Sequence, residues 1–272
     1  EQGADVTVGC MEVPREEAKG FGVMAVDDKD RITEFVEKPA DPPPMPGKPD
    51  VSLASMGIYV FNARFLFEQL QRDADDPRSS HDFGKDVIPH CVKRYRSYAQ
   101  NFAESHVGDP GKEPYWRDVG TLDAYWEANM DLVQVTPHLN LYDDNWPIWT
   151  WQPQSPPGKF VFDDDGRRGM AVDSMVSGGC IVSGSTVRRS MLFSSVVVHS
   201  YSLIEDSIVL PHVQIGRSCI LKKCIIDKNC VIPEGTQIGV DPAADRKRFH
   251  VTPSGITLVS REMLGQDVSP LR

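Results

Sequence analysis

The order of apolar and polar residues divides the chain into three regions. Residues 1 to about 136 alternate apolar runs of strand length with helical spacings, which predicts a layered α/β region. Strands are expected at Asp5–Met11, Arg31–Val36 and Ser55–Phe61. Helices are expected to begin at Asn62, at Ser80 or Asp82, and at Thr121, because each of these side chains can cap a first turn. The third helix carries an apolar stripe of Leu122, Tyr125, Trp126, Met130 and Val133.

Proline marks the segments between these elements. The stretch ADPPPMPGKPD (40–50) cannot join the interior of a sheet, because proline lacks an amide hydrogen, so we expect a loop there. From about 137 to 170 the periodicity fades, and proline, tryptophan and aspartate dominate. We interpret 137–170 as a linker to a separate region at 171–272.

The last region is an internal repeat. Aliphatic residues recur every six positions, sometimes every five, at Val176, Val182, Leu192, Val198, Ile204, Val209, Ile215, Leu221, Ile226, Ile232 and Ile238. Small residues, Cys or Val mostly follow four positions later. A period of six with short β-prone segments predicts a parallel β-helix, in which each coil turns one large aliphatic residue inward and stacking supplies the core. This pattern determines a fold and leaves the function open, since such coils serve both as catalytic platforms and as scaffolds.

Composition and charge narrow the class of protein. The chain has 272 residues, 40% of them hydrophobic, and a formal net charge of −10 with no basic block to offset it. That balance argues against general binding to nucleic acid or to a membrane surface, whereas phosphate ligands need only a few local cations. No signal peptide and no apolar run of membrane-spanning length is visible. The opening EQGADVTVGC enters a strand pattern at once, and we expect a chain cut from a longer one.

The six cysteines form no CxxC pair and no dense framework, which indicates reduced thiols in a cytosolic protein. Cys219, Cys224 and Cys230 invite comparison with a zinc site. They fall in the small-residue position of successive coils, so packing explains them better.

Three short motifs could carry chemistry, and each also has a purely structural interpretation. In FVEKP (35–39), Lys38 at a strand end could meet a phosphate or be an exposed edge charge. In LASMGIYVF (53–61), a glycine within a strand would let a ligand approach, and Ser55 or Tyr59 could bind sugar hydroxyls; the alternative is a bulge with a satisfied core serine. In YWRDVGT (115–121), Asp118 could bind a divalent cation or pair with Arg117 to anchor a loop.

The segment SSHDFGKD (79–86) is less specific. His81 at a helix start is more often a cap or surface residue than a catalyst. The Asp-Phe-Gly triplet resembles the kinase magnesium motif, but no glycine-rich loop or HRD precedes it, so we reject that interpretation.

Taken in order, these motifs closely resemble the bacterial ADP-glucose pyrophosphorylase (glucose-1-phosphate adenylyltransferase) family over essentially the whole chain. The matching segments are FGVMAVD (21–27), EFVEKPADPP (34–43), SLASMGIYVF (52–61), SSHDFGKDVIP (79–89), EPYWRDVGTLDAYWEAN (113–129), NWPI (145–148), VSGGC (176–180), GRSC (216–219), VIPEG (231–235) and REML (261–264). The resemblance implies part of a Rossmann-like nucleotidyltransferase domain at 1–136, which binds the sugar phosphate. It implies a left-handed parallel β-helix at 171–272 for oligomerisation and regulation. It further implies a cytoplasmic, regulated homotetramer in glycogen synthesis that transfers adenylyl from ATP to glucose 1-phosphate with Mg²⁺.

The same resemblance implies roles for individual residues. Lys38 would hold the sugar phosphate and, with Asp118, serve catalysis, Asp118 being one of two metal-binding aspartates. The remaining glucose 1-phosphate contacts would be Glu37, Ser55, Tyr59, Asp82, Phe83 and Trp116. A phosphorylated-sugar activator and the inhibitor AMP would bind basic residues, among them Arg261 and Lys228. Lys228 stands where the family usually has arginine, and Gly265 stands where another basic residue is common.

The family's glycine-rich GGxGTRL-type loop and its second metal-binding aspartate do not occur in this chain. We therefore expect the 272 residues by themselves to be catalytically inactive, with most ATP contacts lying outside them. Three alternatives remain open: a uridylyl- or guanylyltransferase with its own β-helix, a hexapeptide acyltransferase using His199 or His212, and a non-catalytic β-helix scaffold.

Overall fold

The computed structural model describes residues 3–105, 115–145 and 147–267. The chain divides into two compact units, Glu1–Pro114 and Tyr115–Arg272, here called unit 1 and unit 2. The division falls ahead of the boundary expected at 136. It does so because the helix α5 (Leu122–Leu132) belongs by its contacts to unit 2. No helix in the described part of the chain is both long and apolar enough to cross a membrane.

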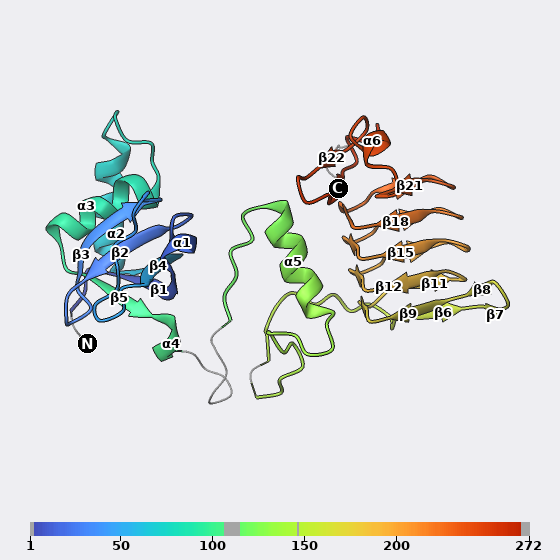
Figure 1. Cartoon of the computed structure of the whole chain (residues 1–272), viewed down its shortest axis with the longest axis horizontal. Helices are drawn as coiled ribbons and strands as arrows, with labels where there is room; N and C mark the ends of the chain where they lie inside the picture. The colour runs from blue at the N-terminus through green and yellow to red at the C-terminus, as the bar shows by residue number, and fades with distance from the viewer. Residues whose placement is uncertain (1–2, 106–114, 146, 268–272) are drawn as a thin grey trace. The chain divides into compact units, whose positions relative to one another are not determined.

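Unit 1 is a five-stranded sheet in the order β3-β2-β4-β1-β5 with helices packed against it (Figure 1). Its strands are β1 (Val6–Pro14), β2 (Gly22–Val26), β3 (Ile32–Glu37), β4 (Val51–Phe61) and β5 (Ser97–Asn101). Its helical elements are α1 (Arg15–Ala18), α2 (Ala63–Ala74), the π-helical turn η1 (Phe83–Val87), α3 (Ile88–Arg94) and α4 (Phe102–Ser105). The three expected strands are confirmed with bounds that differ by up to four residues, while β2 and β5 were not among them.

Each expected helix start is confirmed by its cap. Asn62 accepts a hydrogen bond from the Arg64 amide at 3.2 Å. Asp82, the second of the two expected starts, accepts one from the Lys85 amide at 2.9 Å. Thr121 accepts one from the Ala124 amide at 3.1 Å. These side chains occupy amide groups that have no partner within the first turn of a helix.

Long-range pairing builds the sheet of unit 1. β1 pairs with β4 in antiparallel fashion and with β5 in parallel, so Val6 lies opposite both Phe61 and Ser97. The sheet curls enough for Arg31, just before β3, to bridge to Tyr98 of β5. The buried core beneath it joins residues of β1, β2, β3, β4, η1 and α3. The proline-rich segment 40–50 forms no strand, as expected.

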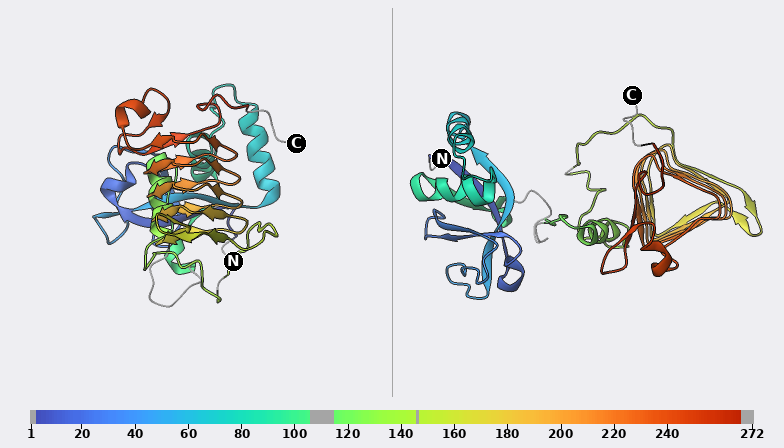
Figure 2. Two further views of the ribbon diagram at one scale, coloured as in Figure 1. Left: turned by 90° about the vertical axis from the view of Figure 1, so that its right-hand side faces the viewer. Right: turned by 90° about the horizontal axis from the view of Figure 1, so that it is seen from above.

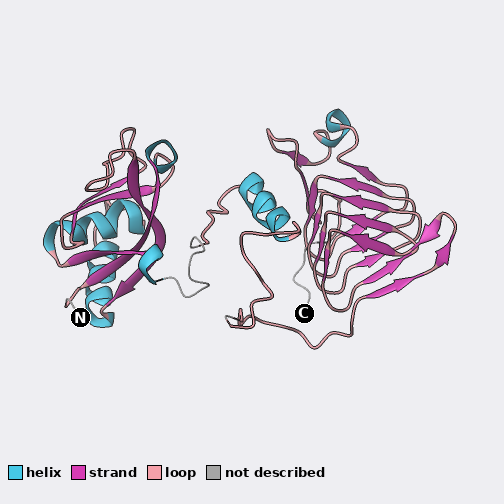
Figure 3. Ribbon diagram, turned by 60° about the horizontal axis from the view of Figure 1, so that its bottom comes forward, coloured by secondary structure: helices cyan, strands magenta, loops and turns pink. Residues whose placement is uncertain are grey.

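Unit 2 is a parallel β-helix whose coils, seen end-on, outline a triangle (Figure 2). The strands of its three sides are β6 (Lys159–Val161), β9 (Met170–Val172), β10 (Met175–Val176), β11 (Ile181–Ser183), β12 (Thr186–Arg188), β13 (Met191–Leu192), β14 (Val197–Val198), β15 (Leu203–Glu205), β16 (Ile208–Val209), β17 (Gln214–Ile215), β18 (Ile220–Lys222), β19 (Cys224–Ile226), β20 (Val231–Ile232), β21 (Gln237–Ile238) and β23 (Thr257–Val259). Two insertions leave the coils: the hairpin of β7 (Asp163–Asp164) and β8 (Arg167–Arg168), and a segment with α6 (Pro242–Asp245) and β22 (His250–Val251) (Figure 3).

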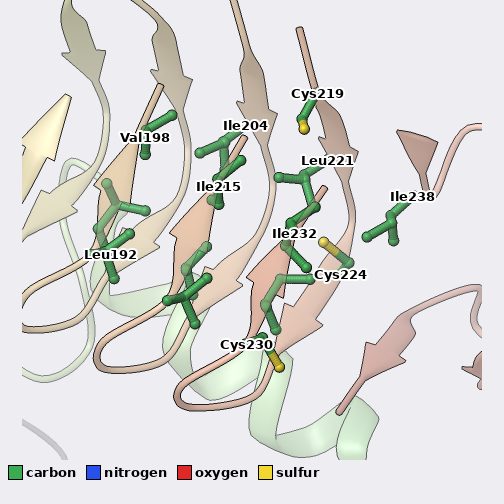
Figure 4. Close-up of a cluster of buried hydrophobic side chains, with 14 of the residues drawn as sticks. Leu192, Val198, Ile204, Ile215, Cys219, Leu221, Cys224, Cys230, Ile232 and Ile238 are labelled. Atoms are coloured by element: carbon green, nitrogen blue, oxygen red, sulfur yellow. The ribbon is translucent and has the colours of Figure 1, made fainter. Parts of the chain in front are cut away.

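The β-helix begins earlier than the sequence pattern indicated. β6 pairs with β11, and β9 pairs with β12, so the first coil starts at Lys159 within the segment expected to be a linker. The aliphatic repeat is hard to see there because this coil is interrupted by the charged hairpin of β7 and β8. The inward positions expected from Val182 to Ile238 are all buried, and Val176 is partly buried against the same core (Figure 4).

The cysteines expected to fill small positions do so. Cys219, Cys224 and Cys230 are buried in the core of the β-helix, as Figure 4 shows. All six cysteines of the chain are buried free thiols. Burial raises the pKa of Cys224 and of Cys230 to about 12, which keeps both thiols protonated and unreactive at neutral pH.

The helix α5 packs along one side of the β-helix through the apolar stripe that the sequence predicted. Met130 and Val133 join Ile208 and Ile225 in a buried cluster. The Trp126 indole donates a hydrogen bond to the Asp206 carbonyl at 2.9 Å, and Thr252 donates one to Asp123 at 2.6 Å. The stripe therefore has a partner surface within unit 2.

Candidate functional site

The candidate sugar-phosphate residues of unit 1 begin where β3 ends. Lys38 follows the strand with φ of 48° and is exposed, while its amide donates to the Phe21 carbonyl at 2.9 Å. A positive φ is uncommon for a lysine, and such a conformation is held by its surroundings. The turn leaves the Lys38 side chain at the surface, which is consistent both with a phosphate contact and with an exposed edge charge.

The carboxylate of Glu37 lies between two glycines. A Cβ atom added to Gly22 of β2, or to Gly84 of η1, would stand 2.8 Å from Glu37 Oε2. A side chain at either position would therefore push the carboxylate away. Sequence reasoning missed both glycines as site residues, although Gly22 lies in FGVMAVD and Gly84 in SSHDFGKD, two of the segments that carried the resemblance.

A β-bulge places Ser55 and Tyr59. The register of β1 against β4 shifts between Gly9 and Cys10, and Gly57 takes φ of 70°. Ser55 is buried, its Oγ accepts a hydrogen bond from the Gly57 amide at 3.2 Å, and it also bonds the Tyr59 hydroxyl. The structural interpretation of this motif, a bulge with a satisfied serine, is confirmed. The bulge interpretation and the sugar-binding interpretation are compatible, because the bulge helps to set the position of Tyr59.

Tyr59 stacks on Phe83 and completes a compact group. The two ring centroids are 5.6 Å apart and the planes differ by 13°. Burial raises the pKa of the Tyr59 hydroxyl, the hydrogen bond from Ser55 opposes this shift, and the nearby carboxylates of Glu37 and Asp82 add to it. The hydroxyl therefore stays protonated at neutral pH and can donate a hydrogen bond.

Unit 1 thus brings together five of the predicted sugar contacts: Glu37, Ser55, Tyr59, Asp82 and Phe83. The group presents two carboxylates, two hydroxyls and an aromatic face, with Phe83 37% exposed. Carboxylates and hydroxyls can hydrogen-bond sugar hydroxyls, and an aromatic face can cover the apolar side of a sugar ring. Asp82 has a structural duty as well, because it caps η1.

Trp116 and Asp118 belong to unit 2. The exposed Asp118 carboxylate accepts a hydrogen bond from the Gly120 amide at 3.1 Å. The Arg117 guanidinium lies 6.0 Å from the centre of the Tyr115 ring, and no Arg117–Asp118 ion pair is formed between these two described residues. The alternative in which Arg117 and Asp118 pair to anchor a loop is therefore wrong for this structure.

The implied Mg²⁺ ion finds a partial fit at Asp118. Carboxylate oxygens suit Mg²⁺, and only one of the two oxygens is described as hydrogen-bonded. Over residues 3–105, 115–145 and 147–267, no group of three or more His, Cys, Asp or Glu side chains is placed to hold a metal. Asp118 can therefore supply one ligand, and a complete site would need oxygens from the substrates or from another segment.

The two candidate effector residues lie on neighbouring coils. Ile226 pairs with Val259 in the parallel register of β19 and β23, so Lys228 and Arg261 each follow two residues beyond that pair. Lys228 is exposed, and the Nε of Arg261 is buried without a hydrogen-bond partner. Gly265 has φ of 68° and open space around its Cα, so the missing basic side chain leaves a gap rather than a packed contact.

The histidines considered for acyl transfer are not arranged for catalysis. His199 follows β14 and His212 precedes β17, so they occupy different corners of the coil, and both are exposed. Neither side chain makes a hydrogen bond or ion pair within the described residues. A general base needs a partner that orients it, and the described structure supplies none.

Comparison with known proteins matches two family models to successive parts of the chain. Residues 1–135 match the family model described as "Nucleotidyl transferase", and residues 156–259 match "GlmU-like, C-terminal hexapeptide". A glucose-1-phosphate adenylyltransferase of Dechloromonas aromatica is 65% identical over 263 residues, covering 97% of this chain. The chain belongs to the glucose-1-phosphate adenylyltransferase family.

Two more members of that family also align over nearly the whole chain. The enzyme of Nitrosospira multiformis is 61% identical over 269 residues, or 99% of this chain. That of Paramagnetospirillum magneticum is 64% identical over 263 residues, or 96% of it. The chain spans 60%, 63% and 61% of the lengths of these three relatives. The activity of a whole adenylyltransferase is therefore a matter for proposal here.

Proposed function

We propose that this chain is the sugar-phosphate-binding and β-helix portion of a cytoplasmic glucose-1-phosphate adenylyltransferase. The whole enzyme would transfer adenylyl from ATP to α-D-glucose 1-phosphate, giving ADP-glucose and pyrophosphate for glycogen synthesis. The observation that carries the proposal is the group of Glu37, Ser55, Tyr59, Asp82 and Phe83 in a chain 65% identical to a protein of that name. The family of the relatives favours adenylyl over uridylyl or guanylyl transfer.

In this reaction an oxygen of the glucose phosphate attacks the α-phosphorus of ATP. The bond between that phosphorus and the oxygen bridging to the β-phosphorus breaks, and the electron pair leaves with pyrophosphate. Such transfers depend on positioning and on charge compensation. Mg²⁺, held in part by Asp118, would offset negative charge on the phosphates when bound.

The chain's own residues would position the sugar phosphate. Lys38 would hold the phosphate as a point charge, and the carboxylate of Glu37 would accept hydrogen bonds from glucose hydroxyls. Tyr59 would donate a hydrogen bond, while Phe83 and Trp116 would cover the apolar face of the ring. Lys228 and Arg261 would contribute to binding of the regulators, a phosphorylated-sugar activator and AMP, in a homotetramer.

Binding of glucose 1-phosphate to the 272-residue chain, measured by calorimetry, tests the assignment directly. Lys38→Ala should weaken it about tenfold, since a hydrogen bond to a charged group contributes about 1.5–3 kcal/mol. Lys29→Ala removes another exposed lysine from the same unit and should leave the affinity unchanged. Unchanged affinity in Lys38→Ala would overturn the role given to this lysine.

Catalysis calls for a separate experiment. In a full-length enzyme, Asp118→Asn should mainly lower turnover at limiting Mg²⁺, whereas Lys38→Ala should mainly raise the apparent KM for glucose 1-phosphate. The isolated 272-residue chain should release no pyrophosphate from ATP and glucose 1-phosphate. Measurable release would contradict the expectation that the nucleotide contacts lie elsewhere.

A further inference from the structure

A second polar pocket lies in unit 1, apart from the candidate sugar site. It is an open pocket with a volume of about 320 Å³, lined by the end of α2, the turn after it, η1 and α3. Its cationic lining residues are Arg72, Lys85, Lys93 and Arg94. The pocket shares η1 with the sugar site but not the residues, since neither Asp82 nor Phe83 lines it.

The carboxylates of this pocket are already engaged. Asp73 accepts hydrogen bonds from Ser79 Oγ at 2.8 Å and lies 2.9 Å from His81 Nδ1. Asp76 bonds Arg78, which is not a lining residue. Asp86 accepts from the amide and hydroxyl of Ser80, at 3.1 and 2.6 Å. The hydrogen-bonding capacity of each carboxylate is therefore used within the turns beside the pocket.

The cations, by contrast, are poorly paired: Arg72 makes one long ion pair with Asp73, and the other three make none with the described residues. Nε and Nη2 of Arg72 are shielded from solvent without a hydrogen-bond partner, and Nη2 stands 3.7 Å from Asp73 Oδ1, too far for a hydrogen bond. Among the described residues, no carboxylate lies within ion-pair distance of Lys85, Lys93 or Arg94. A guanidinium that is shielded from solvent and has only one long ion pair keeps its hydrogen-bond donors free for an anion that enters the neighbouring cavity.

His90 lies in the same positive field. The guanidinium nitrogen Nη1 of Arg94 is 2.6 Å from His90 Nδ1, which must then accept the hydrogen bond. Burial, together with the charges of Arg72 and Arg94, lowers the pKa of His90, and Asp73 opposes this only weakly. The imidazole is therefore neutral, with a proton on Nε2 as a further donor.

We propose that this pocket binds a compact phosphate-type oxyanion, either free phosphate or the phosphate group of a small metabolite. Arginine and lysine around a small cavity match the charge and the hydrogen-bond acceptors of such an anion. Because Lys85 and Asp86 belong to η1, which Asp82 caps and Phe83 begins, an occupied pocket would stiffen an element of the sugar site.

The test follows the imidazole resonances of His90, assigned with His90→Gln, in the 272-residue chain. Added inorganic phosphate, against chloride at the same ionic strength, should raise the His90 pKa saturably. Lys93→Gln and Arg72→Gln should each weaken phosphate binding about tenfold. Lys93 is exposed, so its variant stays informative if Arg72→Gln fails to fold. Arg64→Gln, on α2 with a side chain 90% exposed and outside the pocket, should change nothing.

Two further arms separate the possible sources and sites. Glycerol 3-phosphate replaces inorganic phosphate in one arm, and tighter binding of either identifies a phosphate ester or the free ion as the preferred ligand. Lys38→Gln removes the candidate sugar-phosphate contact in the other arm, and the His90 response should survive it. No saturable response to either anion, or a response lost in Lys38→Gln and kept in Lys93→Gln, would overturn the proposal.

Discussion

The two units bury their apolar residues in different ways. In unit 2 the inward side chains of successive coils stack on one another, so the core from Val182 to Ile238 is one continuous cluster. In unit 1, β4 pairs with β2 only through Leu53 and Ala54, and its later residues are paired on one side alone within the described strands. Ile58 and Val60 on that stretch are 54% and 67% exposed.

The two units differ in how far along the chain a residue must find its packing partners. A coil of the β-helix needs only its two neighbours, so the role of a residue follows from its place in the repeat. A strand of unit 1 needs partners far along the chain, such as Val6 with Phe61 and with Ser97. Five of the candidate sugar contacts lie in the unit where positions depend on such distant pairing.

The largest expected effect concerns backbone space in the β-helix. Gly239 and Gly235 both have φ of 73°. A Cβ atom added to Gly239 would stand 1.7 Å from the Lys222 carbonyl oxygen, whereas a Cβ atom added to Gly235 would have no surrounding atom within 4 Å. Gly235→Ala should lower the free energy of unfolding by about 1–2 kcal/mol from conformation alone. Gly239→Ala should lower it by more than about 4 kcal/mol, or prevent folding. Equal effects in urea denaturation would contradict the clash.

Removing one inward side chain sharpens the comparison of the units. Leu221→Ala, at a fully buried position, should destabilise unit 2 by about 2–5 kcal/mol. Val231→Ala, at a position 52% exposed on a neighbouring coil, should cost far less. All five tryptophans lie in unit 2, so tryptophan fluorescence in urea reports that unit selectively. A loss of unit 1 in the same transition, seen by hydrogen exchange, would show that the units are not independent.

A hydroxyl ladder between coils should have a smaller effect. Ser202 Oγ donates to the Gly216 carbonyl at 2.9 Å and accepts from the Cys219 amide at 3.0 Å, across neighbouring coils. Ser202→Ala leaves the buried Cys219 amide without a partner and removes the bond to the partly buried Gly216 carbonyl, and it should lower the free energy of unfolding by about 1–3 kcal/mol. Ser194→Ala is the control, since its hydroxyl makes no hydrogen bond within the described residues. Identical unfolding midpoints for the two variants would exclude a contribution from the ladder.

Low pH should destabilise the two units to different extents, without any mutation. Carboxyls with a lowered pKa are concentrated in unit 1, at Asp5, Glu16, Asp27, Asp73, Asp76 and Asp86, against Glu205 in unit 2. For Asp73 the main cause is the hydrogen bond from His81. A carboxyl whose pKa is lower in the folded state than in the unfolded state stabilises the folded state. This stabilisation is fully present above the unfolded-state pKa, which is about 4, and is lost as the pH falls through the folded-state pKa.

Unit 1 should therefore lose structure first as the pH falls below about 4. Hydrogen exchange would follow unit 1, and tryptophan fluorescence would follow unit 2. Asp73→Asn should flatten the acid response of unit 1, because asparagine does not titrate. Loss of unit 2 before unit 1 would contradict the electrostatic difference between them.

Most of the fold could be predicted from local pattern. The helix caps Asn62, Asp82 and Thr121 can be predicted because each short polar side chain accepts a hydrogen bond from an amide only two or three residues later. The first coil of the β-helix was not predicted, because the hairpin of β7 and β8 interrupts the six-residue repeat of aliphatic positions there. The site was predicted as a set of residues, but not the glycines at 22 and 84 that make room for Glu37.

The sequence by itself determined the β-helix, the inward residues of its coils and the family of the chain, because these depend on repeats and ordered motifs that are local in sequence. Only the tertiary structure decided that α5 packs on the β-helix, that Tyr59 after the bulge stacks on Phe83, and that two guanidinium nitrogens of Arg72 are buried without hydrogen-bond partners. Each of these depends on which distant segments meet, and a charge or an apolar face shows its partner only after the chain has folded.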